Sequence, residues 1–218
     1  GLGGTSVATV TVTVTGSNDA PTAINDVGGT VNDNTVLTVS AGSGVLANDI
    51  DVDATNTLTV ISYSATSSKG GSVIVGTNGS YTYNPDVSST LNSLAEGESS
   101  IDTFVYTASD GYGATSTATV TLTVSGANDA PVVGNDTGYT ITSEDTPASF
   151  AAPGVFSNDS DYEGDTVTLI AADSTSSNGS TITATTGGGF TYNPTTSSTL
   201  QTLAEDETST DTFSYTVS

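Results

Sequence analysis

The stretch Thr-Ala-Thr-Val-Thr-Leu-Thr-Val-Ser-Gly-Ala-Asn-Asp-Ala-Pro, residues 117–131, indicates both the fold and the organisation of the chain. Its first part alternates Thr with an apolar residue, which is the period of a strand that buries one face of an antiparallel sheet. Its second part contains Gly, Asn and Pro and ends the strand. A closely similar stretch occupies residues 7–21. The two Asn-Asp-Ala-Pro motifs therefore mark two joints in the chain.

The chain of 218 residues repeats itself at the spacing of these motifs, 128 − 18 = 110 residues. Gly-Val-Leu-Ala-Asn-Asp at 44–49 returns as Gly-Val-Phe-Ser-Asn-Asp at 154–159, and Asp-Thr-Phe-Val-Tyr at 102–106 returns as Asp-Thr-Phe-Ser-Tyr at 211–215. A repeat of this size predicts two domains. Short alternating runs with turn signals between them, and no helical period, predict that each domain is a β-sandwich.

The same patterns place the individual elements. Alternation of apolar and polar residues predicts strands, Asn-Gly between two such runs predicts a hairpin, and Leu91 and Leu94 indicate a short helical turn. We expect strands over residues 5–15, 58–61, 72–75, 81–83, 102–106 and 118–124, a hairpin turn at Asn78-Gly79 and a helical turn within 88–99.

The phase of the repeat predicts the domain boundaries. Residues 111–126 match residues 1–16, and Ser218 corresponds to Ser109. We expect residues 1–16 to be the last strand of a preceding or neighbouring repeat, 17–126 a complete sandwich, and 127–218 a second sandwich without its own last strand. Either the chain is an excerpt of a continuous array, or residues 1–16 complete a neighbouring copy by donor-strand complementation. Both alternatives predict a head-to-tail filament.

The charge balance excludes several classes of function. Twenty-four acidic residues face one basic residue, Lys69, for a net charge of -23. Nucleic acids and anionic membranes are therefore excluded as partners, because both require basic patches. No apolar run is long enough to cross a bilayer. The absence of His, Cys and Arg removes the parts of a Ser-His-Asp triad and of a hydrolytic zinc site, so we do not expect an enzyme.

Four motifs carry a resemblance to a known family. The Asn-Asp-Ala-Pro joints, Gly-Val-Leu-Ala-Asn-Asp-Ile-Asp-Val-Asp (44–53), Ser-Leu-Ala-Glu-Gly-Glu (93–98) and Asp-Thr-Phe-Val-Tyr-Thr-Ala-Ser-Asp-Gly (102–111) resemble VCBS and bacterial cadherin-like repeats. These are the tandem extender domains of large secreted RTX-type adhesins. The resemblance covers the whole chain and implies tandem Ig-like/cadherin-like Greek-key β-sandwiches, an extracellular or cell-surface location, and dependence on Ca²⁺. It implies a structural module of an adhesin or biofilm matrix protein.

The acidic residues independently favour calcium. Sixteen of the 24 acids recur as eight pairs between the repeats, and Ca²⁺ prefers carboxylate, amide and carbonyl oxygens. Asp49-x-Asp51-x-Asp53 is not an EF-hand loop, because Val60 and Ile170 stand where the bidentate Glu is required. By the resemblance, each joint takes ligands from its Asn-Asp and from a loop of the following domain. The candidate ligands are Asn18, Asp19, Asp26, Asp49, Asp51, Asp53, Asn128, Asp129, Asp136, Asp159, Asp161 and Glu163, with Asp33 and Glu144 as secondary candidates.

Two other interpretations compete with this one. The Asn and Asp residues could merely build turns by bonding their own backbone. The chain could also be a ligand-binding adhesion module that contacts a carbohydrate or another surface. Such a module should carry an added loop or aromatic cluster in one of its repeats, and neither repeat departs from the other in this way.

Overall fold

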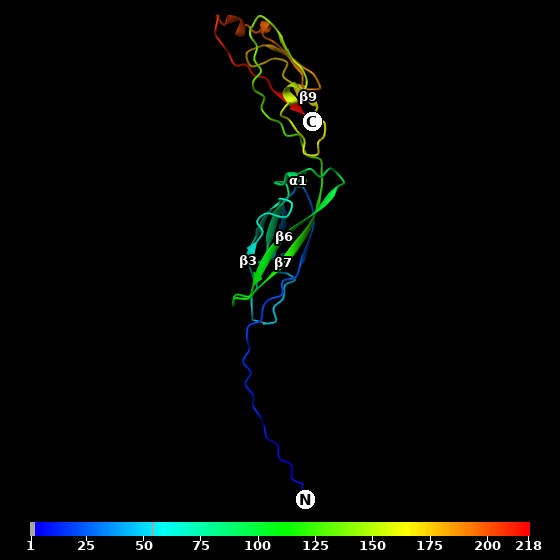
Figure 1. The fold of residues 1–218 in the computed structure, drawn as a ribbon, viewed down its shortest axis with the longest axis vertical. Coiled ribbons are helices and arrows are strands. Elements are labelled where there is room, and N and C mark those ends of the chain that lie inside the picture. Colours follow the sequence, from blue (N-terminus) through cyan, green and yellow to red (C-terminus); the bar gives the residue numbers. More distant parts are fainter. Residues whose placement is uncertain (1–2, 54) are drawn as a thin grey trace.

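A computed structural model describes residues 3–53 and 55–218, which form two β-sandwich domains placed end to end (Figure 1). The N-terminal segment runs away from the first domain as a single extended chain, on the side opposite to the second domain. The fold is all-β, as the alternating sequence predicts, with Ig-like, cadherin-like sandwiches in tandem. In the described part of the chain, no helix has the length and apolar character needed to cross a membrane.

Among its described residues, the first domain contains seven strands in two facing sheets. One sheet has the order β1-β7-β6-β3 and the other the order β2-β5-β4. β1 runs parallel to β7, and the remaining pairs are antiparallel. The strands are β1 (Asp26–Asn32), β2 (Leu37–Val39), β3 (Thr59–Tyr63), β4 (Ser72–Val75), β5 (Tyr81–Asn84), β6 (Ser99–Ser109) and β7 (Thr115–Ser125).

Alternation along the strands produces the core of this domain. Each strand turns every second side chain inward, so β7 buries Val120, Leu122 and Val124 completely. These residues share one core cluster with Phe104 of the neighbouring strand β6 and with Tyr83 of the other sheet. Two short helices close the sandwich: the 3₁₀-helix η1 (Ala41–Ser43) and α1 (Ser89–Asn92). The predicted helical turn and the Asn78-Gly79 hairpin are thus confirmed.

The second domain repeats this plan with fewer strands. Its sheets have the orders β10-β11-β8 and β12-β9. Its core centres on Phe190, whose ring stacks on Phe150 with centroids 4.7 Å apart. Its elements are β8 (Ala148–Phe150), η2 (Gly154–Phe156), β9 (Leu169–Ala172), β10 (Thr181–Ala184), β11 (Phe190–Asn193), η3 (Pro194–Thr196), η4 (Leu200–Thr202) and β12 (Tyr215–Val217).

The strand predicted over residues 5–15 is wrong for this chain. No part of the described segment 3–21 is in a strand, and Val10, Val12 and Val14 are 85%, 76% and 85% exposed. Alternation predicts which face of a strand becomes buried, but a strand also needs a hydrogen-bonded neighbour. In the described structure no strand lies beside these residues, so their alternating sequence does not form a strand.

Candidate functional site

The first joint gathers four predicted ligands. An isolated bridge between Thr22 and Ile50 holds the linker beside the loop that follows residue 50. The backbone N–H of Asp19 donates to Asp53 Oδ2 at 2.8 Å, and the N–H of Asp53 donates to Asp51 Oδ1 at 2.8 Å. The carboxylate of Asp53 in the loop therefore accepts from the backbone of the linker.

Two residues outside the predicted set hold this joint in place. The Asn56 amide donates to Asn18 Oδ1 at 3.4 Å and to Asp51 Oδ2 at 3.3 Å. The Asn18 amide in turn donates to Asp110 Oδ2 at 2.7 Å, in the turn between β6 and β7. Hydrogen bonds from Asn18 and from nearby backbone N–H groups lower the pKa of Asp110. Asp110 and Gly111 form an Asp-Gly pair, which predicts a turn of the backbone. This pair does not predict that the Asp110 side chain contacts the linker.

The second joint contains three acids from three parts of the chain. Asp33 follows β1 of the first domain, Asp129 lies in the linker, and Glu163 lies in a loop of the second domain. Asp33 is fully buried, and its Oδ2 accepts from the N–H of Ala127 at 3.2 Å. Burial raises its pKa, and the charge of Asp129 raises it further. Burial likewise raises the pKa of Glu163, with the charge of Asp129 adding to the effect.

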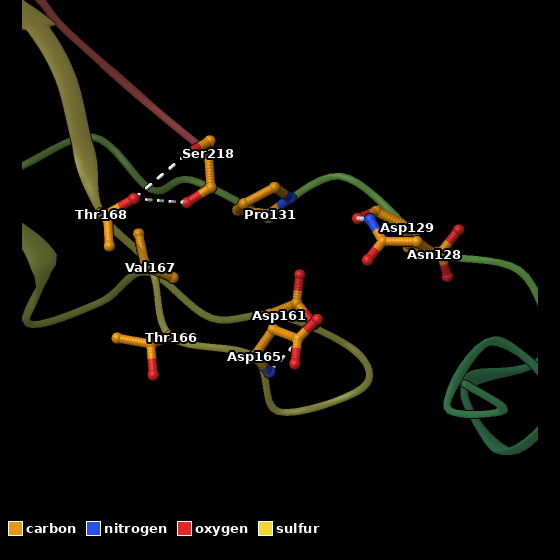
Figure 2. Close-up of a pocket in the computed structure, with 9 residues that line it drawn as sticks. All are labelled: Asn128, Asp129, Pro131, Asp161, Asp165, Thr166, Val167, Thr168 and Ser218. Atoms are coloured by element: carbon orange, nitrogen blue, oxygen red, sulfur yellow. Dashed lines mark hydrogen bonds between the residues drawn. The ribbon is translucent and has the colours of Figure 1, made fainter. Parts of the chain in front are cut away.

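The loop of the second domain adds further oxygen atoms. The N–H groups of Glu163 and Asp165 donate to Asp161 Oδ1 at 3.0 and 3.2 Å. Figure 2 shows Asp161 and Asp165 together on this loop, beside Asn128 and Asp129 of the linker, around one cavity. An isolated bridge between Val132 and Ser160 holds loop and linker together, as Thr22 and Ile50 do in the first domain. Sequence reasoning missed Asp165, which has no counterpart at the same place in the first repeat.

Four further candidate ligands, Asp26, Asp49, Asp136 and Asp159, lie within the domains beside a tyrosine, whereas Glu144 is bonded only through its backbone carbonyl, to the Gln201 amide. Tyr106 on β6 donates its hydroxyl to Asp49 Oδ1 and Oδ2 at 2.9 and 3.0 Å. Asp49 Oδ1 also accepts from the N–H of Ile24 at 2.7 Å. Asp26 lies close to this pair, and burial together with the charge of Asp49 raises its pKa to about 6. This position holds two neighbouring carboxyl groups, and the Tyr106 hydroxyl donates to that of Asp49.

The second domain repeats this arrangement. Tyr215 donates to Asp159 Oδ1 and Oδ2 at 3.2 and 3.0 Å. Burial raises the pKa of the neighbouring Asp136, and the charge of Asp159 adds to the shift. The two tyrosines recur at the same place in Asp-Thr-Phe-x-Tyr, but their contacts with the carboxylates join residues more than 50 positions apart and leave no local sequence signal.

Unsatisfied carboxylate oxygens are concentrated at the second joint. Within the described residues, buried oxygens without a hydrogen-bond partner include Asp33 Oδ1, Asp129 Oδ2 and both carboxylate oxygens of Glu163. Asp26 Oδ2 and Asp136 Oδ2, which lie inside the domains, are also buried without a hydrogen-bond partner. A buried carboxylate oxygen without a donor is unfavourable unless a cation compensates it. Within residues 3–53 and 55–218, no group of three or more acidic residues is placed so that it could hold a metal ion. Carboxylate oxygens are the type of donor that a hard cation prefers, but the described part of the structure does not gather them into a metal site.

Comparison with known proteins agrees with the fold. The profile of a bacterial cadherin-like domain matches residues 18–126, and that of a bacterial Ig domain matches residues 128–218. No curated protein matches the chain. Two of the similar solved structures are extracellular cadherin fragments, and the chain spans less than half of either.

One is the protocadherin gammaB7 EC3-6 cis-dimer, with 13% identity, a TM-score of 0.34, and coverage of 91% of this chain and 47% of that one. The other is protocadherin gamma B2 domains 1-5, with 15% identity, a TM-score of 0.32, and coverage of 81% and 32%. The profile match to half of the residues, with the joint motif at its start, decides the family: the chain belongs to the bacterial cadherin-like domains.

Proposed function

We propose that this chain is a structural, extracellular repeat module of a bacterial adhesin or matrix protein whose joints bind calcium and stiffen. Bacterial cadherin-like and Ig-like domains are extracellular adhesion or repeat modules, typically without enzymatic activity, and cadherin-like domains generally bind Ca²⁺. The observation that supports the proposal is that Asp33, Asp129 and Glu163, in the first domain, the linker and the second domain, each carry a buried carboxylate oxygen without a hydrogen-bond partner.

The mechanism follows from the electrostatics of this joint. Asp33, Asp129 and Glu163 belong to the first domain, the linker and the second domain. Their charges repel one another, which favours a larger separation and a variable angle between the domains. A bound Ca²⁺ supplies positive charge and several coordination positions for oxygen. With the repulsion removed, the three parts of the joint can remain close, so the angle between the domains becomes fixed.

The first joint has the ligands for the same function. Asn18, Asp19, Asp51 and Asp53 are already assembled by hydrogen bonds, without an acid from a preceding domain. A neighbouring repeat placed before residue 18 would supply that third part. We therefore propose a head-to-tail array in which every joint has the composition of the second one, with donor-strand complementation by residues 1–16 as the means of connecting copies.

Solution scattering with and without calcium tests the joint. We expect Ca²⁺ at about 1 mM, the affinity range of extracellular modules, to lengthen the particle and narrow its distribution of distances relative to EDTA. Asp129→Asn and Glu163→Gln should each remove this response. Glu205→Gln changes the charge equally at an exposed position away from the joint and should keep it. Identical particle dimensions with calcium and with EDTA in the unaltered chain would refute the proposal.

A further inference from the structure

The outer face of the sheet β1-β7-β6-β3 carries no charge, although the chain has a net charge of -23. Only two of the 24 acids occur on its four strands, Asp26 and Asp102, and the single base, Lys69, occurs on none of them. Asp102 has no exposed surface. Asp26 lies near the buried Tyr106 and the Asp49 carboxylate, so it points to the inner side of the sheet. The outward positions of all four strands are therefore neutral.

Side chains branched at Cβ cover this face. β7 presents a row of threonines between its buried residues, and β6 presents threonines and apolar residues in turn. The two rows are in register along the body of the domain (Figure 1), so that Thr121 is opposite Thr103 and Thr119 is opposite Val105. On β1, Val27 is opposite Thr121 and is 90% exposed. Because Thr and Val have nearly the same shape, the face is a level layer of methyl groups and hydroxyls.

The neutral face continues beyond β6, on the side away from β7. Residues 64–68 run beside β6 there, with the N–H of Ser64 donating to Val105 O at 2.8 Å, and none of these residues is charged. Hydroxyls also bond one another across the face, since Ser62 Oγ donates to Thr107 Oγ1 at 2.9 Å. Hydroxyls that are already paired lose little when a partner displaces water from them.

The second domain has a carboxylate at the edge of the corresponding surface. Asp173 stands where the first repeat has Ser64, and it is exposed. The two residues hold the same backbone position, because the N–H of Asp173 donates to Ser214 O at 2.9 Å as that of Ser64 does to Val105 O. A carboxylate is therefore compatible with the fold at this position, and the first domain is neutral there.

Charge and chemistry restrict what can cover this face. A strongly charged partner finds no opposite charge on it, and a carbohydrate meets no aromatic ring, carboxylate or amide at the outward positions of β6 and β7. The cores of interfaces between proteins, by contrast, are depleted in charged residues. A second copy presents the same neutral layer, so two acidic chains can approach through it without carboxylates facing one another.

We propose that two copies of the chain associate side by side through this face of the first domain, sheet against sheet. Facing sheets pack about 10 Å apart with their strands nearly aligned, so the side chains of the two layers can interdigitate. The same patch is used on both copies, and a two-fold axis therefore relates them. This contact goes beyond the head-to-tail array, because it joins neighbouring stalks rather than successive repeats.

The size of the face predicts a weak contact that salt strengthens. Strands of 11 residues at about 3.4 Å per residue, in a sheet of four strands about 4.8 Å apart, give about 500 Å² on each copy. Stable complexes bury about 800 Å² per partner, so one pair of domains associates weakly, and several repeats side by side associate more strongly. The sheet β2-β5-β4 is also uncharged, but its strands of three or four residues cover only about 150 Å². The net charge opposes the approach of two copies until salt screens it.

Small-angle scattering in EDTA tests this contact without calcium at the joints. As NaCl rises from about 0.05 M to about 1 M, the unaltered chain should change from net repulsion to attraction, and concentrated samples should give thicker rather than longer particles. Thr121→Asp, in the middle of the face, should remove the attraction. Ser64→Asp should weaken it and keeps the test valid if Thr121→Asp does not fold, because the second repeat has Asp at this position. Thr82→Asp places the same charge on the outward side of the other sheet and should keep the attraction.

Single cysteines locate the contact, because the chain has no native cysteine. A contact between equivalent faces raises the local concentration of thiols on them. At high salt we expect Thr119→Cys or Thr121→Cys to oxidise to a covalent dimer at least about tenfold faster than Thr82→Cys.

Three results would overturn the proposal. They are repulsion at every salt concentration, an attraction that Thr82→Asp removes as readily as Thr121→Asp does, and equal rates of oxidation for all three cysteine variants. Retention of a monomeric chain on dextran, lost in Thr121→Asp, would assign the face to a neutral carbohydrate instead. Because all samples contain EDTA, failure of the lateral contact leaves the calcium joint untouched. Failure of the calcium response likewise leaves the lateral contact untouched.

Discussion

Asp102 is a charged side chain with no exposed surface, and its environment explains why it is tolerated. Its carboxylate accepts from Tyr83 OH at 2.6 Å, from Ser68 Oγ at 2.7 Å and from the N–H of Lys69 at 2.9 Å, as well as from Ser67 Oγ. Burial alone would raise its pKa, but these donors together lower it. Asp211 has the same set of donors in the second domain.

Removing the charge of Asp102 should destabilise the first domain. In Asp102→Asn, the side-chain NH₂ group replaces one acceptor oxygen. It faces hydroxyl or N–H donors, which then lose their acceptor. We expect a loss of about 3 kcal/mol in the free energy of unfolding, measured in urea by circular dichroism. Glu96→Gln removes the same charge at an exposed position and should change stability by less than about 0.5 kcal/mol. Equal stabilities of the two variants would contradict this role for Asp102.

Two groups of carboxyls give the metal-free protein opposite responses to pH. The pKa of Asp26 is raised to about 6 by burial and by the charge of Asp49, so its ionisation opposes folding. Its contribution favours the fold at acidic pH and is lost as the pH rises from about 4 to about 6. Burial alone would raise the pKa of Asp211, but hydrogen bonds from Ser176 and Tyr192 lower it to about 2. Its contribution is present above about pH 4 and is lost as the pH falls towards 2.

In EDTA we therefore expect the stability maximum to lie near pH 4. Urea midpoints measured across the pH range should fall on both sides of it. Asp26→Asn should flatten the fall between about pH 4 and 6, because the variant has no ionisation at this position, and should leave the acid side unchanged. A midpoint that rises steadily up to pH 7 in the unaltered chain would show that Asp26 does not oppose folding.

At the scale of elements, the same sequence pattern has two outcomes in this chain. Leu122 and Val12 occupy equivalent places in equivalent stretches, yet Leu122 is fully buried in β7 and Val12 is 76% exposed. Leu122→Ala should destabilise the first domain by about 2–5 kcal/mol through loss of burial and an unfilled space. Val12→Ala, measured at a concentration too low for association, should change the unfolding of this domain by less than about 0.5 kcal/mol. A comparable loss from Val12→Ala would place residues 5–15 on the first domain instead.

The elements that local sequence predicted well are those whose partners lie nearby in the chain. β4 and β5 form a hairpin around Asn78-Gly79, and the predicted strand over residues 72–75 agrees with the structure. β1 was not predicted, because Val27-Gly28-Gly29 interrupts its alternation and its partner β7 is distant in sequence. Gly28 is required there by close packing, since a Cβ would lie 2.6 Å from Leu122 Cδ2. The local sequence therefore gives little indication that this parallel strand forms.

The candidate ligands show the same limit. Comparison of the two repeats identified the acids that recur in both. It did not separate the carboxylates at the joints from those that accept hydrogen bonds from Tyr106 and Tyr215. That separation depends on contacts between residues more than 50 positions apart. Asp33 was a secondary candidate because the repeat aligns poorly around it, and yet it is the most buried acid at the second joint.

For the whole molecule, a net charge of -23 with one basic residue means that carboxylates are compensated by ions from solution or remain repulsive. Two kinds of compensation are distinguishable. Monovalent salt screens all exposed charges alike, so we expect the unfolding temperature in EDTA to rise with NaCl in every variant. Calcium binding at a joint depends on particular oxygens, so at constant ionic strength Ca²⁺ should raise the unfolding temperature further.

Selectivity between divalent ions separates a joint site from general screening. Mg²⁺ demands a near-ideal octahedral set of ligands and keeps its water, whereas the open arrangement around Asp129 suits the flexible coordination of Ca²⁺. At equal ionic strength we expect the increment in unfolding temperature from Mg²⁺ to be clearly smaller than that from Ca²⁺. Glu163→Gln should reduce the Ca²⁺ increment and keep the NaCl response, and Glu205→Gln should keep both. Equal increments from the two divalent ions, unaffected by Glu163→Gln, would mean that calcium acts on this surface only as a screening ion.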